Sequence, residues 1–131
     1  MLSGNYCYSA ERFIPPGEEK LAMYAKALRC YQAAMGRLHP DIERVEVPYE
    51  GKSLPALLVH PDPQATGGRP APAMVYFDGF DVTKEIQYGY AVPDLAARGV
   101  GCLVVDGPGN GESGRFRFVS RPGAGVNYWD G

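Results

Sequence analysis

Two short turns hold the residue types that could take part in a reaction. DGFD at 78–81 follows the apolar run 73–77, and DGPGNGESG at 106–114 follows the apolar run 100–105. A glycine directly after a buried strand lets the backbone bend sharply and leaves the amides beyond it facing the space above the sheet's carboxyl edge. The first turn, with Gly79, therefore predicts a place where backbone amides meet a ligand.

The second turn formally matches the dinucleotide-binding fingerprint through Gly109, Gly111 and Gly114. That fingerprint needs a helix opened by its third glycine, on whose N-terminus a pyrophosphate rests. The residues 115–122, RFRFVSRP, have poor helix character, and no strand ending in an acidic residue follows at the required distance. A Rossmann-like nucleotide-binding unit built on these glycines, or a non-catalytic interaction module, stays open as the alternative function.

Ser113 begins to match the nucleophile elbow G-x-S-x-G, because Gly111 stands two residues before it. Position 115 is arginine, however, and the helix that must follow such a serine is not predicted. No G-x-S-x-G occurs anywhere in the chain. Ser113 is therefore expected to be a turn residue and not a nucleophile.

Histidines and cysteines form no catalytic or metal-binding pattern. His39 and His60 each precede a proline at the boundary of a predicted element, with no serine or cysteine at a recognisable spacing, so both are expected to be structural. Cys7, Cys30 and Cys102 are odd in number and lack C-x-x-C spacing, which favours reduced thiols over a disulfide framework or a zinc site. We expect no cofactor, no metal and a cytoplasmic location.

Composition excludes several classes of protein. The 131 residues are 45% hydrophobic with a net charge of −2, which suits one ordinary globular core and predicts neither a nucleic-acid nor a membrane partner. No apolar run approaches the roughly 18 residues of a membrane-spanning helix, and the N-terminus lacks the pattern of a signal peptide. A soluble, unexported protein is expected.

An amphipathic helix is predicted from Glu18 to Leu38. Its apolar residues recur at spacings of three and four, which places them on one stripe of the helix. Acidic residues stand in the first turn and Arg37 in the last, as the helix dipole favours, and Pro40 ends the helix. Such a stripe could line a substrate pocket but is more often plain core. The residues before this helix are expected to form a packed, irregular segment.

Two β-rich runs joined by EGK at 50–52 predict an antiparallel edge hairpin over residues 42–60. Pro48 and Pro55 each remove a ladder donor, which an edge or a bulge tolerates better than the middle of a sheet. Residues 61–72 are expected to be a surface linker rich in proline and glycine.

Residues 73–105 predict one parallel βαβ unit with buried strands at 73–77 and 100–105. The helical residues between them follow an N-cap at Asp81 or Thr83, are interrupted at a glycine and a proline, and end before a second glycine. The fold class is therefore α/β: an antiparallel edge hairpin plus one parallel βαβ unit, preceded by an amphipathic helix.

These motifs resemble the α/β-hydrolase fold and, within it, the family of the FrsA-like esterases and the 2,6-dihydroxypseudooxynicotine hydrolases. The resemblance implies the end of a helical N-terminal region in residues 1–41 and a partial α/β-hydrolase sheet in residues 42–131. The segments that carry it lie between Ser9 and Arg117 and are SAERFIPPGEEKLAMYAKALRCYQ, IERVEVPYEGKSLPALLV, MVYFDGFDVTKE and DGPGNGES.

By this resemblance, the backbone amide of Phe80, after the turn at Gly79, is the first oxyanion donor of a serine-type hydrolase acting on an ester or on a carbon–carbon bond next to a carbonyl. One such donor contributes about 2.7–4 kcal/mol to transition-state stabilisation. The family's serine, acid and histidine are not matched, and no histidine follows His60. The resemblance therefore implies an inactive internal piece of a larger hydrolase, which in the full-length protein acts on a small-molecule carbonyl substrate.

The family's sheet order places the strand 100–105 between the second strand of the hairpin and the strand 73–77. The other neighbour of 73–77 in the family has no counterpart in this chain. An uncharged apolar strand at an open edge is a site of association. We therefore expect self-association through the open sheet edge at AMVYF.

Overall fold

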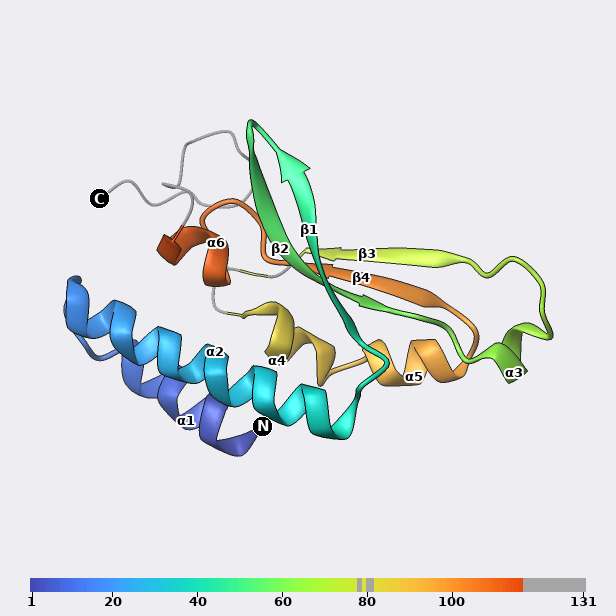
Figure 1. The fold of residues 1–131 in the computed structure, drawn as a ribbon, viewed down its shortest axis with the longest axis horizontal. Coiled ribbons are helices and arrows are strands. Elements are labelled where there is room, and N and C mark those ends of the chain that lie inside the picture. Colours follow the sequence, from blue (N-terminus) through green and yellow to red (C-terminus); the bar gives the residue numbers. More distant parts are fainter. Residues whose placement is uncertain (78, 80–81, 117–131) are drawn as a thin grey trace. The chain divides into compact units, whose positions relative to one another are not determined.

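The chain divides into two compact units, residues 1–40 and 41–131. The structure is a computed structural model that describes residues 1–77, 79 and 82–116 (Figure 1). The first unit is helical, and the second contains the sheet and the remaining helices.

Two helices that pack against each other make up the first unit: α1 (Leu2–Glu11) and α2 (Glu18–Leu38). The bounds of α2 are those predicted, with acidic residues in its first turn and Arg37 in its last. The middle of the predicted apolar stripe is buried, whereas its ends at Leu21 and Leu38 are exposed.

The helix α1 corrects the expectation of an irregular segment. A helix this short is weak on its own, and no side chain caps its N-terminus, so packing against α2 must hold it. Gly4 lies against the ring of Tyr31, where an added Cβ would be 2.6 Å from Cε1, and the Tyr31 hydroxyl donates to Asn5 Oδ1 at 2.8 Å. The rings of Tyr8 and Tyr24 meet edge to face with 6.2 Å between centroids.

Four strands form one mixed sheet in the second unit, in the order β1-β2-β4-β3. β1 (Glu43–Tyr49) and β2 (Lys52–Val59) form the predicted antiparallel hairpin. β3 (Ala73–Phe77) and β4 (Gly101–Val105) are parallel, and β4 lies between β2 and β3 (Figure 1). The predicted α/β class, edge hairpin and strand order are confirmed.

The described part of the second unit also contains four helices: α3 (Pro63–Thr66), α4 (Lys84–Tyr88), α5 (Val92–Ala97) and α6 (Gly111–Phe116). α4 and α5 are the two pieces of the predicted interrupted helix. α3 and α6 differ from the expectations of a plain linker and of no helix around the glycine-rich turn. The Asp62 carboxylate caps α3 by accepting from the Gln64 N–H. The carboxylate of Asp106, directly after β4, accepts from the Glu112 N–H in the first turn of α6.

Both faces of the central strands bury apolar side chains. On one face Leu54, Ala56 and Val105 form a buried cluster. α4 and α5 contact β4, and in Figure 1 they lie on one side of the sheet. The face opposite the first cluster holds buried side chains of β2 and β4: Leu57, Val59, Cys102 and Val104. Among the described residues, no helix combines the length and the apolar character that crossing a membrane requires.

β3 is the outer strand next to β4, and its side chains are not buried as those of a central strand would be. Met74, Val75 and Phe77 are 41%, 53% and 60% exposed. The strand has no charged residue and no proline, which are features that commonly block pairing between edges. No other described strand pairs with its second side, which can therefore accept another strand.

Self-association through β3 stays a prediction, and a second copy of the same edge is the partner we expect. Two identical uncharged edges can pair about a twofold axis, as in other isologous interfaces. Val75→Lys should convert associated chain to monomer in sedimentation velocity without unfolding it, because this side chain is half exposed. Tyr90→Lys, which adds the same charge at another exposed aromatic position, is the control. A parent chain that sediments as a monomer at all concentrations would contradict the prediction.

Candidate active site

The carboxyl ends of β3 and β4 meet at one edge of the sheet because the two strands are parallel. Ligand sites in open α/β sheets lie outside this edge. The loop after β3 ends at Thr83, and the loop after β4 starts at Asp106. Gly79 belongs to the first loop and is exposed, whereas the predicted oxyanion residue Phe80 lies outside the described residues.

The carbonyl oxygen of Gly79 accepts two hydrogen bonds, and the one from Asn110 joins the two loops. Asn110 Nδ2 donates to the carbonyl oxygen of Gly79 at 3.3 Å. The Val82 N–H donates to the same oxygen at 3.2 Å. A side chain from the loop after β4 therefore holds Gly79 at the predicted site.

Lys84, the first residue of α4, lies among carboxylates that are almost fully buried. Its Nζ is 2.8 Å from Asp106 Oδ2, 2.9 Å from Glu85 Oε1 and 3.1 Å from Glu112 Oε2. The side chains of Lys84 and Asp106 are both 0% exposed. Because an isolated buried ion is strongly destabilising, each of these groups depends on the others for compensation.

Asp106, the residue after β4, also binds main-chain groups. Its Oδ1 accepts from the N–H of Lys84 at 2.8 Å, and its Oδ2 accepts from the N–H of Glu112 at 2.9 Å. Thr83 is the N-cap residue of α4, one of the two predicted positions, but its side chain makes no capping bond. Asp106 therefore satisfies the first turn of α4 from a distant part of the sequence.

Arg44 on β1 forms an ion pair with Glu112 on the solvent side of these buried charges. Its Nη2 lies 2.6 Å from both carboxylate oxygens of Glu112. The Arg44 side chain is 34% exposed and that of Glu112 only 9%, so the pair spans from the surface to the interior. We call the five charged residues the Lys84 cluster: Arg44, Lys84, Glu85, Asp106 and Glu112.

Burial and charge act in opposite directions within the Lys84 cluster. Burial acts to lower the pKa of Lys84, but the carboxylates of Glu85, Asp106 and Glu112 outweigh it and raise that pKa above the ordinary lysine value. Burial raises the pKa of Glu85; the Lys84 ammonium opposes this rise, and the Asp106 charge adds to it. Glu85 Oε2 has no hydrogen-bond partner among the described residues. A proton on Glu85 leaves two positive and two negative groups in the cluster.

Two glycines allow the loop after β4 to close tightly around Asp106. Gly111 has φ +45°, and an added Cβ there would overlap the Asp106 carboxyl group. An added Cβ at Gly114 would overlap the carbonyl oxygen of Gly109. The glycine spacing that resembles a dinucleotide fingerprint is therefore explained by packing within the loop.

Ser113 lies inside α6 and is fully buried, so the expectation of a turn residue is corrected. Its hydroxyl donates to the carbonyl oxygen of Asp106 at 2.8 Å. The helix forms because the Glu112 N–H in its first turn binds the Asp106 carboxylate, a contact that the local sequence does not reveal. A hydrogen-bonding role in the loop accounts for this serine.

Neither histidine is a member of the Lys84 cluster. His60 Nε2 is 2.7 Å from Glu43 Oε1 in an exposed pair, and His39 is the C-cap residue of α2. In the part of the chain that the structure describes, no group of His, Cys, Asp and Glu residues fits a metal ion. Within the cluster the Lys84 ammonium occupies the place between the carboxylates where a cation would bind.

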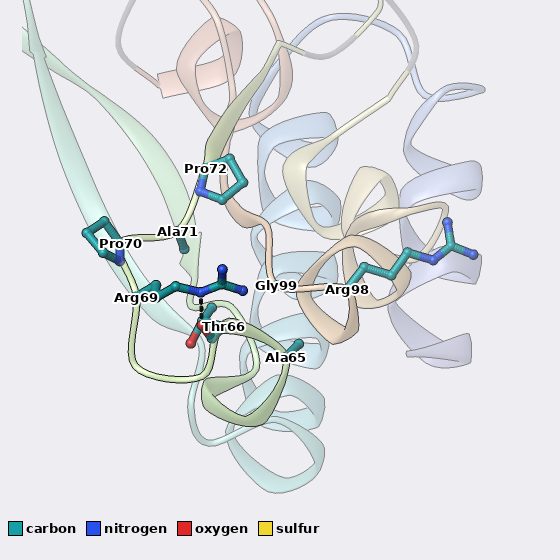
Figure 2. A pocket seen from close by; sticks show the side chains of 8 residues that line it. All are labelled: Ala65, Thr66, Arg69, Pro70, Ala71, Pro72, Arg98 and Gly99. Carbon is teal, nitrogen blue, oxygen red and sulfur yellow. Dashed lines mark hydrogen bonds between the residues drawn. The ribbon is translucent and has the colours of Figure 1, made fainter.

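A surface hollow of about 340 Å³ lies at the other end of the strands (Figure 2). It is lined by residues that precede β3 and β4, among them Pro72 and Gly99. Arg69 Nε donates to the carbonyl of Thr66 at 3.3 Å, while Figure 2 shows the Arg98 guanidinium directed away from Arg69. The hollow is therefore separate from the carboxyl edge where the two loops meet.

Sequence reasoning singled out Gly79 and the glycine-rich turn but assigned no role to the Lys84 cluster. Two signals were present: an aspartate directly after a buried strand, and a Lys-Glu pair at a helix start. Neither signal identifies its partner, because Lys84 and Asp106 are 22 residues apart and Arg44 and Glu112 are 68 residues apart.

The fold and part of the sequence are similar to those of known proteins. No family model matches the chain. The computed structure superimposes on the solved structure of AbyA5 with a TM-score of 0.67 at 21% identity, covering 86% of this chain and 32% of that one. This likeness shows the α/β-hydrolase fold over the segment it covers. The sequence matches to curated α/β hydrolases, one of them 32% identical over 79% of this chain, place the segment in the α/β-hydrolase superfamily.

Particular relatives are hydrolases. The 2,6-dihydropseudooxynicotine hydrolase of Paenarthrobacter nicotinovorans is 29% identical over 121 residues, which are 92% of this chain and 31% of the relative. The crystal structure of a 2,6-dihydroxy-pseudo-oxynicotine hydrolase matches with a TM-score of 0.61 at 29% identity, over 83% and 31% of the two chains. Hydrolase LUC6 of a Fusarium species is 38% identical over 77 residues, or 58% and 18% of the two chains. The chain thus spans less than a third of the length of these relatives, and the family resemblance predicted from its motifs is confirmed.

Glu85 gives a pH-dependent prediction. Because its pKa is raised in the folded state, the folded chain holds a proton that the unfolded chain releases. The stability contribution of Glu85 is complete below its unfolded pKa of about 4.3 and is lost as the pH rises through the folded value. Between the unfolded and the folded pKa of Glu85, the free energy of unfolding of Glu85→Gln relative to that of the parent should therefore rise by about 1.4 kcal/mol per pH unit.

Urea unfolding between about pH 4 and pH 8 measures this difference. Glu43→Gln, which removes an exposed carboxylate of the same unit, controls for the loss of one surface charge. Parallel stability curves for Glu85→Gln and the parent would mean that Glu85 takes up no proton on folding.

Proposed function

We propose that the chain is a segment of a serine-type α/β hydrolase that acts on an ester or on a carbon–carbon bond next to a carbonyl. Its contribution is the oxyanion turn after β3, with Gly79 at the bend and the Phe80 amide as donor. The observation that supports the proposal is the bond from Asn110 to the Gly79 carbonyl, which joins Gly79 to the loop after β4 at the carboxyl edge of parallel strands.

The proposed chemistry needs groups that these residues do not supply. A nucleophile attacks the substrate carbonyl carbon, the carbonyl oxygen gains negative charge, and backbone N–H groups stabilise that charge. The chain has no G-x-S-x-G, and its last histidine is His60, which pairs with Glu43 at the surface. In this proposal the nucleophile, the acid and the histidine come from residues other than these 131, and the chain alone turns over no ester.

The substrate class follows from the same reasoning. A small molecule with a reactive carbonyl suits an oxyanion turn, and the similarity to a 2,6-dihydropseudooxynicotine hydrolase supports that class. The cysteines Cys7, Cys30 and Cys102 are all free, which fits a reducing cytoplasm as the proposed location.

Nucleotide binding at the glycine-rich turn is not favoured. A pyrophosphate would need free N–H groups at the start of a helix. At α6 the Glu112 N–H is already bound by the Asp106 carboxylate, and α6 is only six residues long. We therefore assign this turn a role in holding the loops.

A chimera tests the oxyanion role. The matching segment of the 2,6-dihydropseudooxynicotine hydrolase is replaced by this chain, and hydrolysis of that enzyme's own substrate is followed. Phe80→Pro in the chimera removes the N–H at this position and should lower kcat by about 10²–10³-fold, the usual effect of losing one oxyanion donor. KM should change little because the donor acts on the transition state.

Phe80→Ala is the matched control, since it removes the aromatic ring but keeps the N–H. Circular dichroism of each chimera establishes that it is folded before kinetics are compared. Equal kcat values for the proline and alanine variants would contradict an oxyanion role for this amide.

A further inference from the structure

We infer that Asp106 and Lys84 are positioning residues that hold the turn after β3 in its working geometry. The catalytic meaning of this inference rests on the proposed oxyanion function. The linkage itself concerns only contacts between described residues, so it can be tested separately. The inference gives a role to the buried charges of Lys84 and Asp106, which take no direct part in the proposed reaction.

One carboxylate joins two loops. Asp106 receives three donors: the N–H of Lys84 at 2.8 Å, the Nζ of Lys84 at 2.8 Å and the N–H of Glu112 at 2.9 Å. Its Oδ1 thus fixes the first residue of α4, and its Oδ2 fixes the first turn of α6. Hydrogen bonds to an ionised acceptor are about twice as strong as neutral ones.

Two described residues on either side of Phe80 in the sequence are held by the loop after β4. Asn110 holds the Gly79 carbonyl, and Asp106 holds Lys84 at the start of α4. Phe80, the proposed donor, lies between these two anchors in sequence. A shift of either anchor would move the amide relative to a substrate carbonyl, and displacement of about 1 Å can lower a rate by about 10²-fold.

Burial makes this linkage stiff. Lys84 and Asp106 are 0% exposed, so water cannot replace their contacts. Thr83 supplies no capping bond that could substitute for Asp106 at the start of α4. Separating the partners of a buried ion pair leaves both charges uncompensated, which disfavours a partly open state in which they remain buried.

Glu112 connects Lys84 to Arg44, which is partly exposed. The Glu112 carboxylate accepts from Lys84 Nζ at 3.1 Å and binds Arg44 Nη2 through both oxygens. Arg44 lies on β1, at the far edge of the sheet from β3. The position of the turn is therefore connected to the edge hairpin through side chains of opposite charge.

Amide hydrogen exchange by NMR on the 131-residue chain tests the linkage. In Asp106→Ala we expect exchange at the N–H groups of Val82, Lys84 and Glu112 to accelerate by about ten- to a hundredfold more than exchange in the β2–β4 ladder. Asp106→Asn keeps one acceptor oxygen but replaces the other by a donor group. The amide oxygen is better placed at the Oδ2 position, where it accepts from Lys84 Nζ and from the Glu112 N–H. Exchange should therefore stay slow at Glu112 and be fast at Lys84, a pattern that a loss of overall stability would not produce.

Gly111→Ala provides a second route that keeps every charge. Its Cβ would overlap the Asp106 carboxyl group, so it should give the same local acceleration. Gly51→Ala is the matched control, because Gly51 also has positive φ, at +74°, but no atom lies within 4 Å of an added Cβ.

Equal acceleration at all amides, or no acceleration at Val82 and Lys84, would overturn the positioning role. The oxyanion proposal fails in a different way, through equal kcat values of the Phe80→Pro and Phe80→Ala chimeras. Local acceleration together with that kinetic result would support linked loops and reject only their proposed catalytic purpose.

Discussion

A buried ammonium group surrounded by carboxylates is the constraint on which the second unit depends. Lys84 Nζ has three carboxylate oxygens within 3.1 Å, and its side chain is fully buried. Charges can remain in such a place only if every partner is also in place. Because the partners come from α4, α6 and the end of β4, assembling the cluster also fixes where both loops lie.

The cluster explains why function is expected at this edge of the sheet. Parallel strands bring the loops after β3 and β4 together, and the ion pairs and hydrogen bonds then leave them little freedom. Preorganised backbone donors stabilise a transition state without reorganising during the reaction. The proposed oxyanion role of the Phe80 amide needs this property, and the similarity to α/β hydrolases gives it a chemical context.

Local pattern was sufficient for most elements of the fold. The alternation of the hairpin, the apolar runs of β3 and β4 and the stripe of α2 each lie within a few residues, so periodicity predicts them. α1 and α6 could not be predicted in this way. Tyr31 supports the first from a distant position, and Asp106 supports the second through a side-chain contact that periodicity does not reveal. Likewise, the motifs predicted a bend at Gly79, while the bond from Asn110 to Gly79 and the Lys84 cluster became visible only in three dimensions.

A double-mutant cycle between Lys84→Met and Asp106→Asn, followed by urea unfolding, tests the central claim most directly. Each single variant removes one charge from a buried cluster and leaves the remaining charges unbalanced, so each should be strongly destabilised. The double variant should then be more stable than the sum of the single effects by about 2–3 kcal/mol. Additive effects, within about 0.5 kcal/mol, would contradict the view that this ion pair organises the two loops.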